Sequence, residues 1–192
     1  MELESYTILE CIFLVLFIMA PAYLANTIAV LTGGKYPIDQ GKLHTDGNRI
    51  LGDGKTWSGL IGGTIGGIFF GYGLTSLLSA IESIDEDDMS LWGENIFFVF
   101  FLLSFGALFG DMTASFYKRR QNLQRGDKFP LLDMYDFVFM SLLLCFIFQR
   151  DWLLSWILDG WVPLFTILVL TPFLHRGVNI IGYKLGVKNE PW

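Results

Sequence analysis

Five long apolar stretches recur along the 192-residue chain, and shorter polar segments separate them. Most are long enough to cross the hydrocarbon core of a bilayer as a helix, which takes about 20 residues. We therefore predict five membrane-spanning helices, at 6–31, 57–81, 95–117, roughly 134–148 and within 152–181. The last two are the hardest to delimit, because Arg150-Asp151 interrupts the apolar pattern and Asp159-Gly160 allows a later start for the fifth helix.

Composition agrees with this pattern. The chain is 53% hydrophobic and 16% aromatic, and only 17% of its residues are charged, whereas about a quarter are charged in a typical soluble domain. We predict an all-α integral membrane protein that forms a single membrane-embedded domain over residues 1–192.

The basic residues are distributed unevenly between the two sides of the predicted bundle. With five spans, the loops at 32–56 and 118–132 and the C-terminal tail share one side, and every Lys and Arg except Arg150 belongs to that side. Basic residues favour the cytoplasmic side of a membrane. We therefore expect a multi-pass protein of the cell (plasma) membrane with its N-terminus outside, its C-terminus in the cytoplasm and two charged cytoplasmic loops.

One segment of the first loop, "ILGDGKTWSG" at 50–59, is similar to the end of a phosphate-binding P-loop. The full P-loop motif requires a glycine five positions before Gly54, and that position is Arg49. No apolar strand precedes the segment either, so it is not a P-loop of the usual kind.

An acid lies inside the third predicted span. Asp111 precedes Lys118 by seven residues, which places it on the order of 10 Å deeper along a helix. An ionisable group at such a position is a functional candidate, because leaving it unpaired in lipid costs several kcal/mol. A structural ion pair with a nearby lysine is the alternative.

Helical spacing gathers further polar residues around this acid. One stripe at the inner end of the third span carries Asp111, Ser115, Lys118 and Arg119. Asp133 and Asp136 share a face at the start of the fourth span. Three carboxylates near cations suit a polyphosphate held through a divalent metal. The alternative is that Asp133 is an N-cap and Asp136 completes a capping-box-like pair.

The segment "GDMTASFYKRRQNLQRGDKFPLLDMYDF" at 110–137 resembles the C-terminal signature of CTP-dependent lipid cytidylyltransferases: S-x-x-K-R, a short loop, a proline and paired aspartates. The first loop "GGKYPIDQGKLHTDGNRILGDGKTW" and the tail "NIIGYKLGVKNEPW" extend the similarity over the whole chain. The bacterial and eukaryotic relatives carry His-Gly-Gly between the proline and the aspartates, where this chain has Leu131-Leu132. The chain therefore resembles the archaeal CDP-archaeol synthase family.

This resemblance implies a reaction of membrane phospholipid biosynthesis. CTP and an isoprenoid ether-lipid phosphate, 2,3-bis-O-geranylgeranylglycerol 1-phosphate, would give the CDP-lipid and diphosphate with Mg²⁺ as cofactor. The metal ligands would be Asp111, Asp133 and Asp136. Lys118 and Arg119 would neutralise phosphates, and Ser115 would donate a hydrogen bond. A phosphate monoester is largely dianionic at neutral pH, so the reaction needs no general base, and the chain has only His44 and His175 to offer.

The resemblance also gives the first loop a role. We expect Lys55 and Thr56 to contact the triphosphate and Asp53 to assist the metal or the ribose. The alternative is a lysine that only sets topology, beside an N-cap at Thr56 or Ser58. Asn26 and Asn179, in the first and last spans, either contact the lipid head group or cap broken backbone.

The partners expected are CTP, the ether-lipid phosphate and membrane lipids, with no nucleic acid. Glycines at four-residue spacing in 62–71 predict close helix packing, within the chain or across a homodimer. Two other functions would also use acids in or beside spanning helices. A CDP-alcohol phosphatidyltransferase would need aspartates four apart in a motif that is missing here, and a small cation transporter would need acids near the membrane midplane.

Overall fold

The computed structural model describes residues 7–82, 95–124, 127–157, 160–184 and 186. Within these ranges the chain forms six helices: α1 (Ile8–Thr32), α2 (Trp57–Glu82), α3 (Ile96–Arg120), α4 (Pro130–Phe148), α5 (Arg150–Trp156) and α6 (Trp161–Lys184). The described residues contain no strand longer than an isolated bridge. All except α5 are long and apolar enough to cross a membrane, which confirms the five predicted spans.

The boundaries of the last two spans differ from the prediction. α4 begins at Pro130 rather than near 134, because proline favours the first position of a helix. The fifth span starts at Trp161, so the expected start at 152 is wrong and the later start is right. Residues 150–156 instead form the separate helix α5, whose Trp152, Leu153 and Trp156 are buried. α3 extends three residues past 117, and its last turn carries Lys118, Arg119 and Arg120, where cations interact favourably with the helix dipole.

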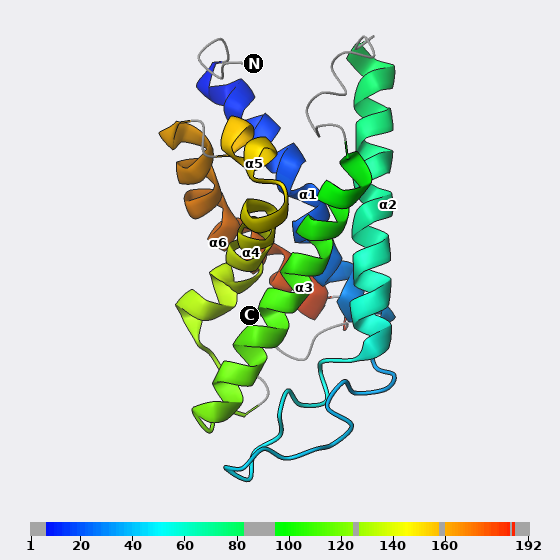
Figure 1. The fold of residues 1–192 in the computed structure, drawn as a ribbon, viewed down its shortest axis with the longest axis vertical. Helices are drawn as coiled ribbons and strands as arrows, with labels where there is room; N and C mark the ends of the chain where they lie inside the picture. The colour runs from blue at the N-terminus through cyan, green and yellow to red at the C-terminus, as the bar shows by residue number, and fades with distance from the viewer. Residues whose placement is uncertain (1–6, 83–94, 125–126, 158–159, 185, 187–192) are drawn as a thin grey trace.

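α3 is the central helix of the bundle. Half of its most apolar 18-residue window is buried, against 22% for α2, α4 and α6. Figure 1 shows the long helices running up and down the molecule, with α1, α2 and α3 side by side. Apolar residues of α1, α3 and α4 form most of the core, including Ile18, Met19, Phe100, Leu103 and Phe137.

The glycine-rich face of α2 packs within the chain. A Cβ at Gly63 would lie 2.7 Å from the carbonyl oxygen of Ala25 on α1, and one at Gly71 would lie 2.9 Å from the Phe100 ring on α3. Only glycine permits backbones to approach this closely. The predicted packing of these glycines within the chain is therefore confirmed, and a homodimer stays a prediction.

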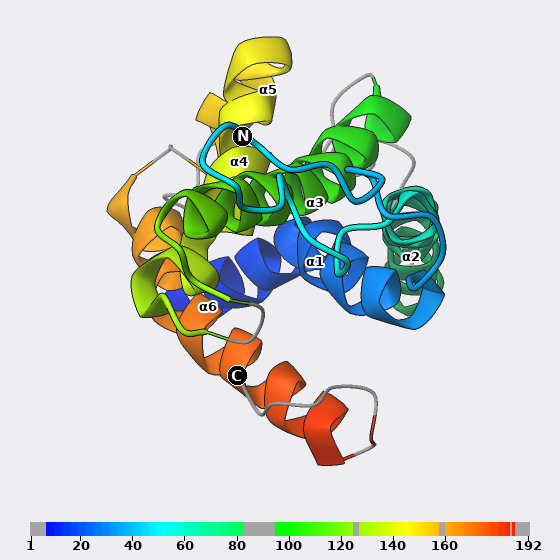
Figure 2. The same ribbon diagram turned by 90° about the horizontal axis from the view of Figure 1, so that it is seen from below.

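The two basic loops lie at the same end of the bundle. Loop 33–56 joins α1 to α2, and the segment 121–129 joins α3 to α4. Figure 1 places both at the lower end, opposite the N-terminus of α1, and Figure 2, seen from that end, shows loop 33–56 lying across α3. The segment between α2 and α3, residues 83–94, lies outside the described residues.

Candidate active site

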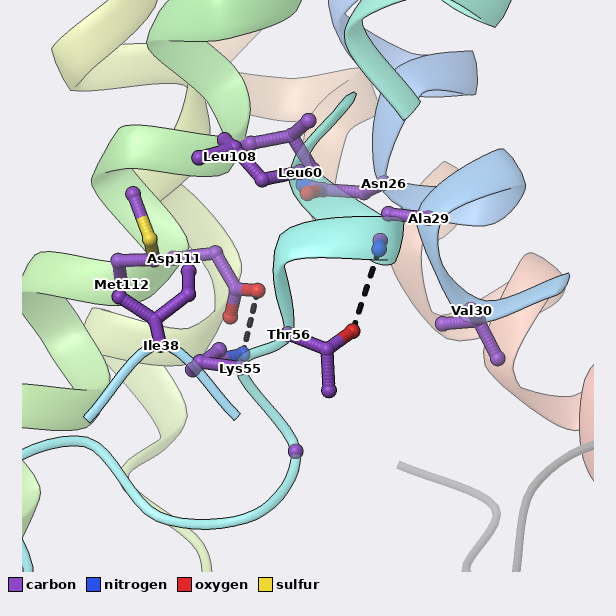
Figure 3. A pocket seen from close by; sticks show the side chains of 12 residues that line it. Asn26, Ala29, Val30, Ile38, Lys55, Thr56, Leu60, Leu108, Asp111 and Met112 are labelled. Atoms are coloured by element: carbon purple, nitrogen blue, oxygen red, sulfur yellow. Dashed lines mark hydrogen bonds and ion pairs between the residues drawn. The ribbon is translucent and has the colours of Figure 1, made fainter. Parts of the chain in front are cut away.

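A lysine from loop 33–56 reaches the acid inside α3. Lys55 Nζ lies 2.5 Å from Asp111 Oδ2, and the Lys55 side chain is 20% exposed. The ion pair considered as the alternative for Asp111 is therefore present. Its partner, however, is the lysine of the GDGKT segment, so the contact joins the two parts of the predicted site (Figure 3).

A cavity of about 90 Å³ lies beside this pair. Its polar wall comes from Lys55, Thr56, Asp111 and Asn26, and Leu60 and Leu108 contribute apolar side chains. The cavity is several times larger than the share of liquid volume of one water, about 30 Å³. It is large enough for a polar part of a ligand.

The two asparagines predicted to bind lipid lie in different places. Asn26 borders the cavity, and its Oδ1 is buried without a hydrogen-bond partner in the part of the chain that the structure describes. Asn179 is buried on α6, with Nδ2 3.3 Å from ring nitrogens of His175. The His175 ring in turn stacks on Phe137, with centroids 6.2 Å apart. The structure therefore places only Asn26 beside the Lys55–Asp111 pair.

Thr56 begins α2. Its buried Oγ1 accepts a hydrogen bond from the backbone N–H of Gly59 at 3.1 Å, which is the geometry of an N-cap. Ser58 instead exchanges hydrogen bonds with the backbone of Lys35. The capping alternative is thus confirmed for Thr56, and a contact to the triphosphate stays a prediction. Asp53 lies at the surface, with its side chain 66% exposed and 2.8 Å from Arg49.

A second lysine–aspartate pair joins α3 to α4. Lys118 Nζ lies 3.0 and 3.2 Å from the two oxygens of Asp133. The same carboxylate accepts the backbone N–H of Phe129 at 2.9 Å. The interpretation of Asp133 as an N-cap is wrong, because the helix begins at Pro130 and Phe129 occupies the cap position.

Asp136, the third predicted carboxylate, lies close to Asp111. Asp136 is within electrostatic range of Asp111, Lys55 and Asp133. Gly110 explains this proximity: a Cβ there would overlap the backbone carbonyl of Asp136, so only glycine lets α3 and α4 approach so closely. Asp111 directly follows Gly110, so it lies where the two helices approach each other and where Asp136 comes within electrostatic range.

The carboxylates do not form a ready-made metal cage. Among the described residues, no three His, Cys, Asp or Glu side chains are grouped closely enough to hold a metal ion. Asp111 and Asp133 each bind a lysine instead. Mg²⁺ commonly takes only one or two carboxylates from a protein and completes its shell with waters and substrate phosphates. Asp111 and Asp136 suit that kind of site, and the three-carboxylate set stays a prediction.

The other two residues of the α3 stripe lie nearer the loops. Arg119 donates a hydrogen bond to the carbonyl oxygen of Leu123, and its guanidinium lies against Gly52, where a Cβ would be 3.3 Å from Arg119 Nε. Ser115 is half-buried, one helical turn after Asp111. Arg119 therefore touches the first loop three residues before Lys55.

Sequence reasoning missed two residues that shape the site. Arg120 ties the end of α3 to loop 33–56, with Nε 3.1 Å from Asp46 Oδ2 and Nη2 donating to the carbonyl oxygen of Arg49 at 2.7 Å. Asp39 is a fully buried carboxylate inside the same loop. An acid followed ten residues later by an arginine is a weak local signal, and only the fold shows that the two meet.

Comparison with known proteins identifies the family. The family model described as CarS-like, CDP-archaeol synthase, matches residues 8–192. The chain is 47% identical to the CDP-archaeol synthase of Methanospirillum hungatei over 91% of this chain and all of that protein. It is 39% identical to the one from Archaeoglobus fulgidus, over 96% and 99% of the two chains. The chain belongs to the CDP-archaeol synthase family.

A solved structure supports the same assignment. An intramembrane enzyme for archaeal membrane lipid biosynthesis superposes with a TM-score of 0.61 at 28% identity, covering 95% of this chain and 96% of that one. The family predicted from the sequence and its class, a nucleotidyltransferase, are therefore confirmed, and the chain is a multi-pass membrane protein. Membership of the CDP-archaeol synthase family also rules out the two alternatives, a CDP-alcohol phosphatidyltransferase and a cation transporter.

Proposed function

We propose that this chain transfers the cytidylyl group of CTP to 2,3-bis-O-geranylgeranylglycerol 1-phosphate, giving the CDP-lipid and diphosphate. The observation that carries the proposal is the Lys55–Asp111 contact beside a cavity. In this contact a cation from the first loop lies next to Asp111 of α3, within electrostatic range of Asp136 of α4. The relatives support the proposal through the name that they share, CDP-archaeol synthase.

The chemical step requires positioning more than proton transfer. An oxygen of the lipid phosphate forms a bond to the α-phosphorus of CTP, and the bond from that phosphorus to the bridging oxygen of diphosphate breaks. The leaving diphosphate takes the electron pair. The attacking phosphate is already largely ionised at neutral pH, so the protein has to align the two phosphates and offset their charge.

The lysine–aspartate pairs suit this task because each holds a cation and an anion together. Lys55 would exchange Asp111 for a phosphate oxygen of CTP, and Lys118 would do the same from Asp133. Arg119 and Ser115 would supply further donors from the same stripe of α3. The exchange would free Asp111 and Asp133 to hold Mg²⁺ together with Asp136, and the metal would neutralise charge on the attacking and leaving oxygens.

The first loop would bind the nucleotide from the side of Gly52 and Gly54. Asp53 is exposed and pairs with Arg49, and it would reach the ribose or the metal from the surface. Thr56 would add its hydroxyl to the triphosphate contacts. Asn26 borders the cavity and would meet the lipid phosphate through its side-chain N–H groups, with Asn179 further along the lipid head.

The direction of the molecule in the membrane is part of the proposal. Loops 33–56 and 121–129 and the last turn of α3, which together carry nine of the 13 Lys and Arg residues, lie at one end of the bundle. The positive-inside tendency favours the cytoplasm for that end, where CTP is available. The protein would then work in the cell membrane with its N-terminus outside, and would take lipid from the bilayer and CTP from the cytoplasm.

A double-label assay tests the function. Purified protein is incubated with Mg²⁺, the ether-lipid phosphate and CTP labelled on either the α- or the γ-phosphorus, and lipid is then extracted. Label from the α position should enter the lipid extract, and label from the γ position should remain in water as diphosphate. Entry of γ label into lipid would indicate phosphoryl transfer, and absence of both labels from lipid would reject the proposal.

A further inference from the structure

Asp39 lies in loop 33–56 and is nevertheless sealed from solvent, with a side-chain exposure of 0%. One carboxylate oxygen accepts Arg49 Nη2 at 2.6 Å and the backbone N–H of Gly41 at 3.1 Å. The other accepts Arg49 Nε at 3.1 Å and the backbone N–H groups of Leu51 and Gly52 at 3.0 and 2.8 Å. A carboxylate offers about four lone-pair sites. Asp39 therefore has no capacity left for a metal or a nucleotide.

These contacts close a ring around the backbone of Lys55. The N–H of Lys55 donates to the carbonyl oxygen of Gly52 at 3.3 Å, and the N–H of Ile38 donates to the carbonyl oxygen of Lys55 at 2.8 Å. Asp39 follows Ile38 directly and holds Gly52 through its side chain. The Asp39 carboxylate thus holds one backbone partner of Lys55, Gly52, and the other partner, Ile38, is the neighbour of Asp39 in the chain.

The turn held in this way requires restraint. Gly52 has φ +92°, a left-handed conformation that glycine adopts readily and that leaves the chain much freedom when unfolded. A free turn of this kind would let the Lys55 side chain sample many directions. Arg49 extends the restraint with its remaining nitrogen, which lies 2.8 Å from Asp53.

We propose that Asp39 is a positioning residue: by fixing the turn from Gly52 to Lys55, it directs the Lys55 ammonium into the cavity where the CTP triphosphate binds. The inference rests on the proposed role of Lys55. It assigns Asp39 no contact with substrate, because all of its acceptor sites are used within the loop. A displacement of about 1 Å in a group that orients substrate can cost about 100-fold in rate, so a buried acid away from the chemistry has a measurable effect on it.

The test combines substitutions in the hydrogen-bonded ring around the Lys55 backbone with removal of the Lys55 side chain itself. CTP and lipid KM values and kcat are measured for Asp39→Ala, Lys55→Ala and the double variant, using monodisperse protein. Asp46→Asn is the matched control, because Asp46 is an acid of the same loop that pairs with Arg120 and takes no part in the ring. Arg49→Lys is a milder variant that keeps the charge but loses the two-pronged contact, and it carries the test if Asp39→Ala does not fold.

Asp39→Ala should raise the KM for CTP about tenfold or more and leave that for lipid within about twofold, in the manner of a misplaced orienting group. In the Lys55→Ala background the same change should have no further effect on the KM for CTP, because the residue that it positions is gone. Arg49→Lys should shift the KM in the same direction by less, and Asp46→Asn should leave it unchanged.

Other results overturn the inference. Full additivity of Asp39→Ala and Lys55→Ala would show that Asp39 acts independently of Lys55. A loss of folded protein with an unchanged KM for CTP in the folded fraction, found for Asp39→Ala or for Arg49→Lys, would show a structural role alone. Failure of the proposed function itself is distinct, because the unaltered protein would then not transfer label from CTP to lipid at all.

Discussion

The ammonium nitrogen of Lys55 lies 2.5 Å from a carboxylate oxygen of Asp111, although the two residues are 56 positions apart in the chain. Lys55 precedes α2 by two residues, and Asp111 lies inside α3. The contact therefore connects loop 33–56 to the part of α3 where Asp136 of α4 also lies within electrostatic range. The site is assembled from three segments that are each incomplete alone.

The first prediction concerns Lys55. Lys55→Ala should raise the KM for CTP about 10- to 100-fold and change that for lipid little, since a hydrogen bond to a charged group contributes about 1.5–3 kcal/mol. Lys42→Ala, at an exposed lysine of the same loop, is the control and should behave like the unaltered protein. Steady-state kinetics with each substrate varied in turn provide the measurement. An unchanged KM for CTP in Lys55→Ala would reduce the lysine to a determinant of topology.

The second prediction concerns acid stability of the first loop. Hydrogen bonds from Arg49, and from the backbone N–H groups of Gly52, Leu51 and Gly41, hold the pKa of Asp39 well below its usual range, against the opposing effect of burial. A depressed pKa stabilises the folded state above the unfolded value of about 3.9, and this stabilisation is lost as the pH falls toward the folded value.

The difference in melting temperature between the unaltered protein and Asp39→Asn should therefore stay constant from pH 7 to about pH 5 and shrink only below about pH 4. Thermal unfolding in detergent across this range is the measurement, and comparison with the variant cancels the other carboxylates. A difference that already declined between pH 7 and pH 5 would contradict the assignment.

The third prediction concerns the packing of α2. A Cβ at Gly67 would lie 2.8 Å from the carbonyl oxygen of Pro21 on α1 and would also meet Ser104 on α3, whereas a Cβ at Gly73 would have nothing within 4 Å. Gly67→Val should destabilise the bundle by about 1–3 kcal/mol, as overpacking does in a dense core, and Gly73→Val should have little effect. Melting of the two variants in the same detergent tests this. Equal stability would mean that α1 and α3 yield easily at this point.

The fourth prediction concerns orientation in the membrane. A cysteine introduced at Asp87 should react from outside intact cells with an impermeant thiol reagent, and one introduced at Gln121 should react only after the membrane is opened. The native Cys11 and Cys145 are both buried and should give a low background. Labelling of Gln121→Cys from outside would place the proposed site on the wrong side for cytoplasmic CTP.

The fold was predictable where the physical signal is local. An apolar run of the right length specifies a spanning helix wherever it occurs, so the sequence located all five. Boundaries were less predictable, because Asp133 looked like a cap while Pro130 actually starts α4. The short helix α5 was missed because its apolar residues belonged to the same run as the fifth span.

The site was predictable only in part. Helical spacing placed Asp111, Lys118 and Arg119 on one stripe of the third span. It also placed Asp133 and Asp136 on one face at the start of the fourth span. The sequence did not show that Lys55 reaches Asp111, because that contact depends on how loop 33–56 folds across α3. Asp39 was missed for the same reason: its five hydrogen bonds come from residues brought together by the loop, and no spacing rule marks them.

The catalytic role of the paired acids is the central claim, and Asp111→Asn and Asp136→Asn test it most directly. Each change keeps size and removes charge, so folding should survive while charge balance at the reacting phosphates is lost. Asp127→Asn is the control, because Asp127 is an acid at the same end of the bundle whose carboxylate accepts the N–H of Gln124.

The measurement is kcat for Mg²⁺-dependent transfer of α-label from CTP into lipid by monodisperse protein. Each of the two variants should lose about 100-fold or more, as on removal of one preorganised electrostatic group. The double variant should lose far less than the product of the two effects, and Asp127→Asn should match the unaltered enzyme. Rates near those of the unaltered enzyme in both single variants would contradict the account and leave Asp111 and Asp136 with structural roles only.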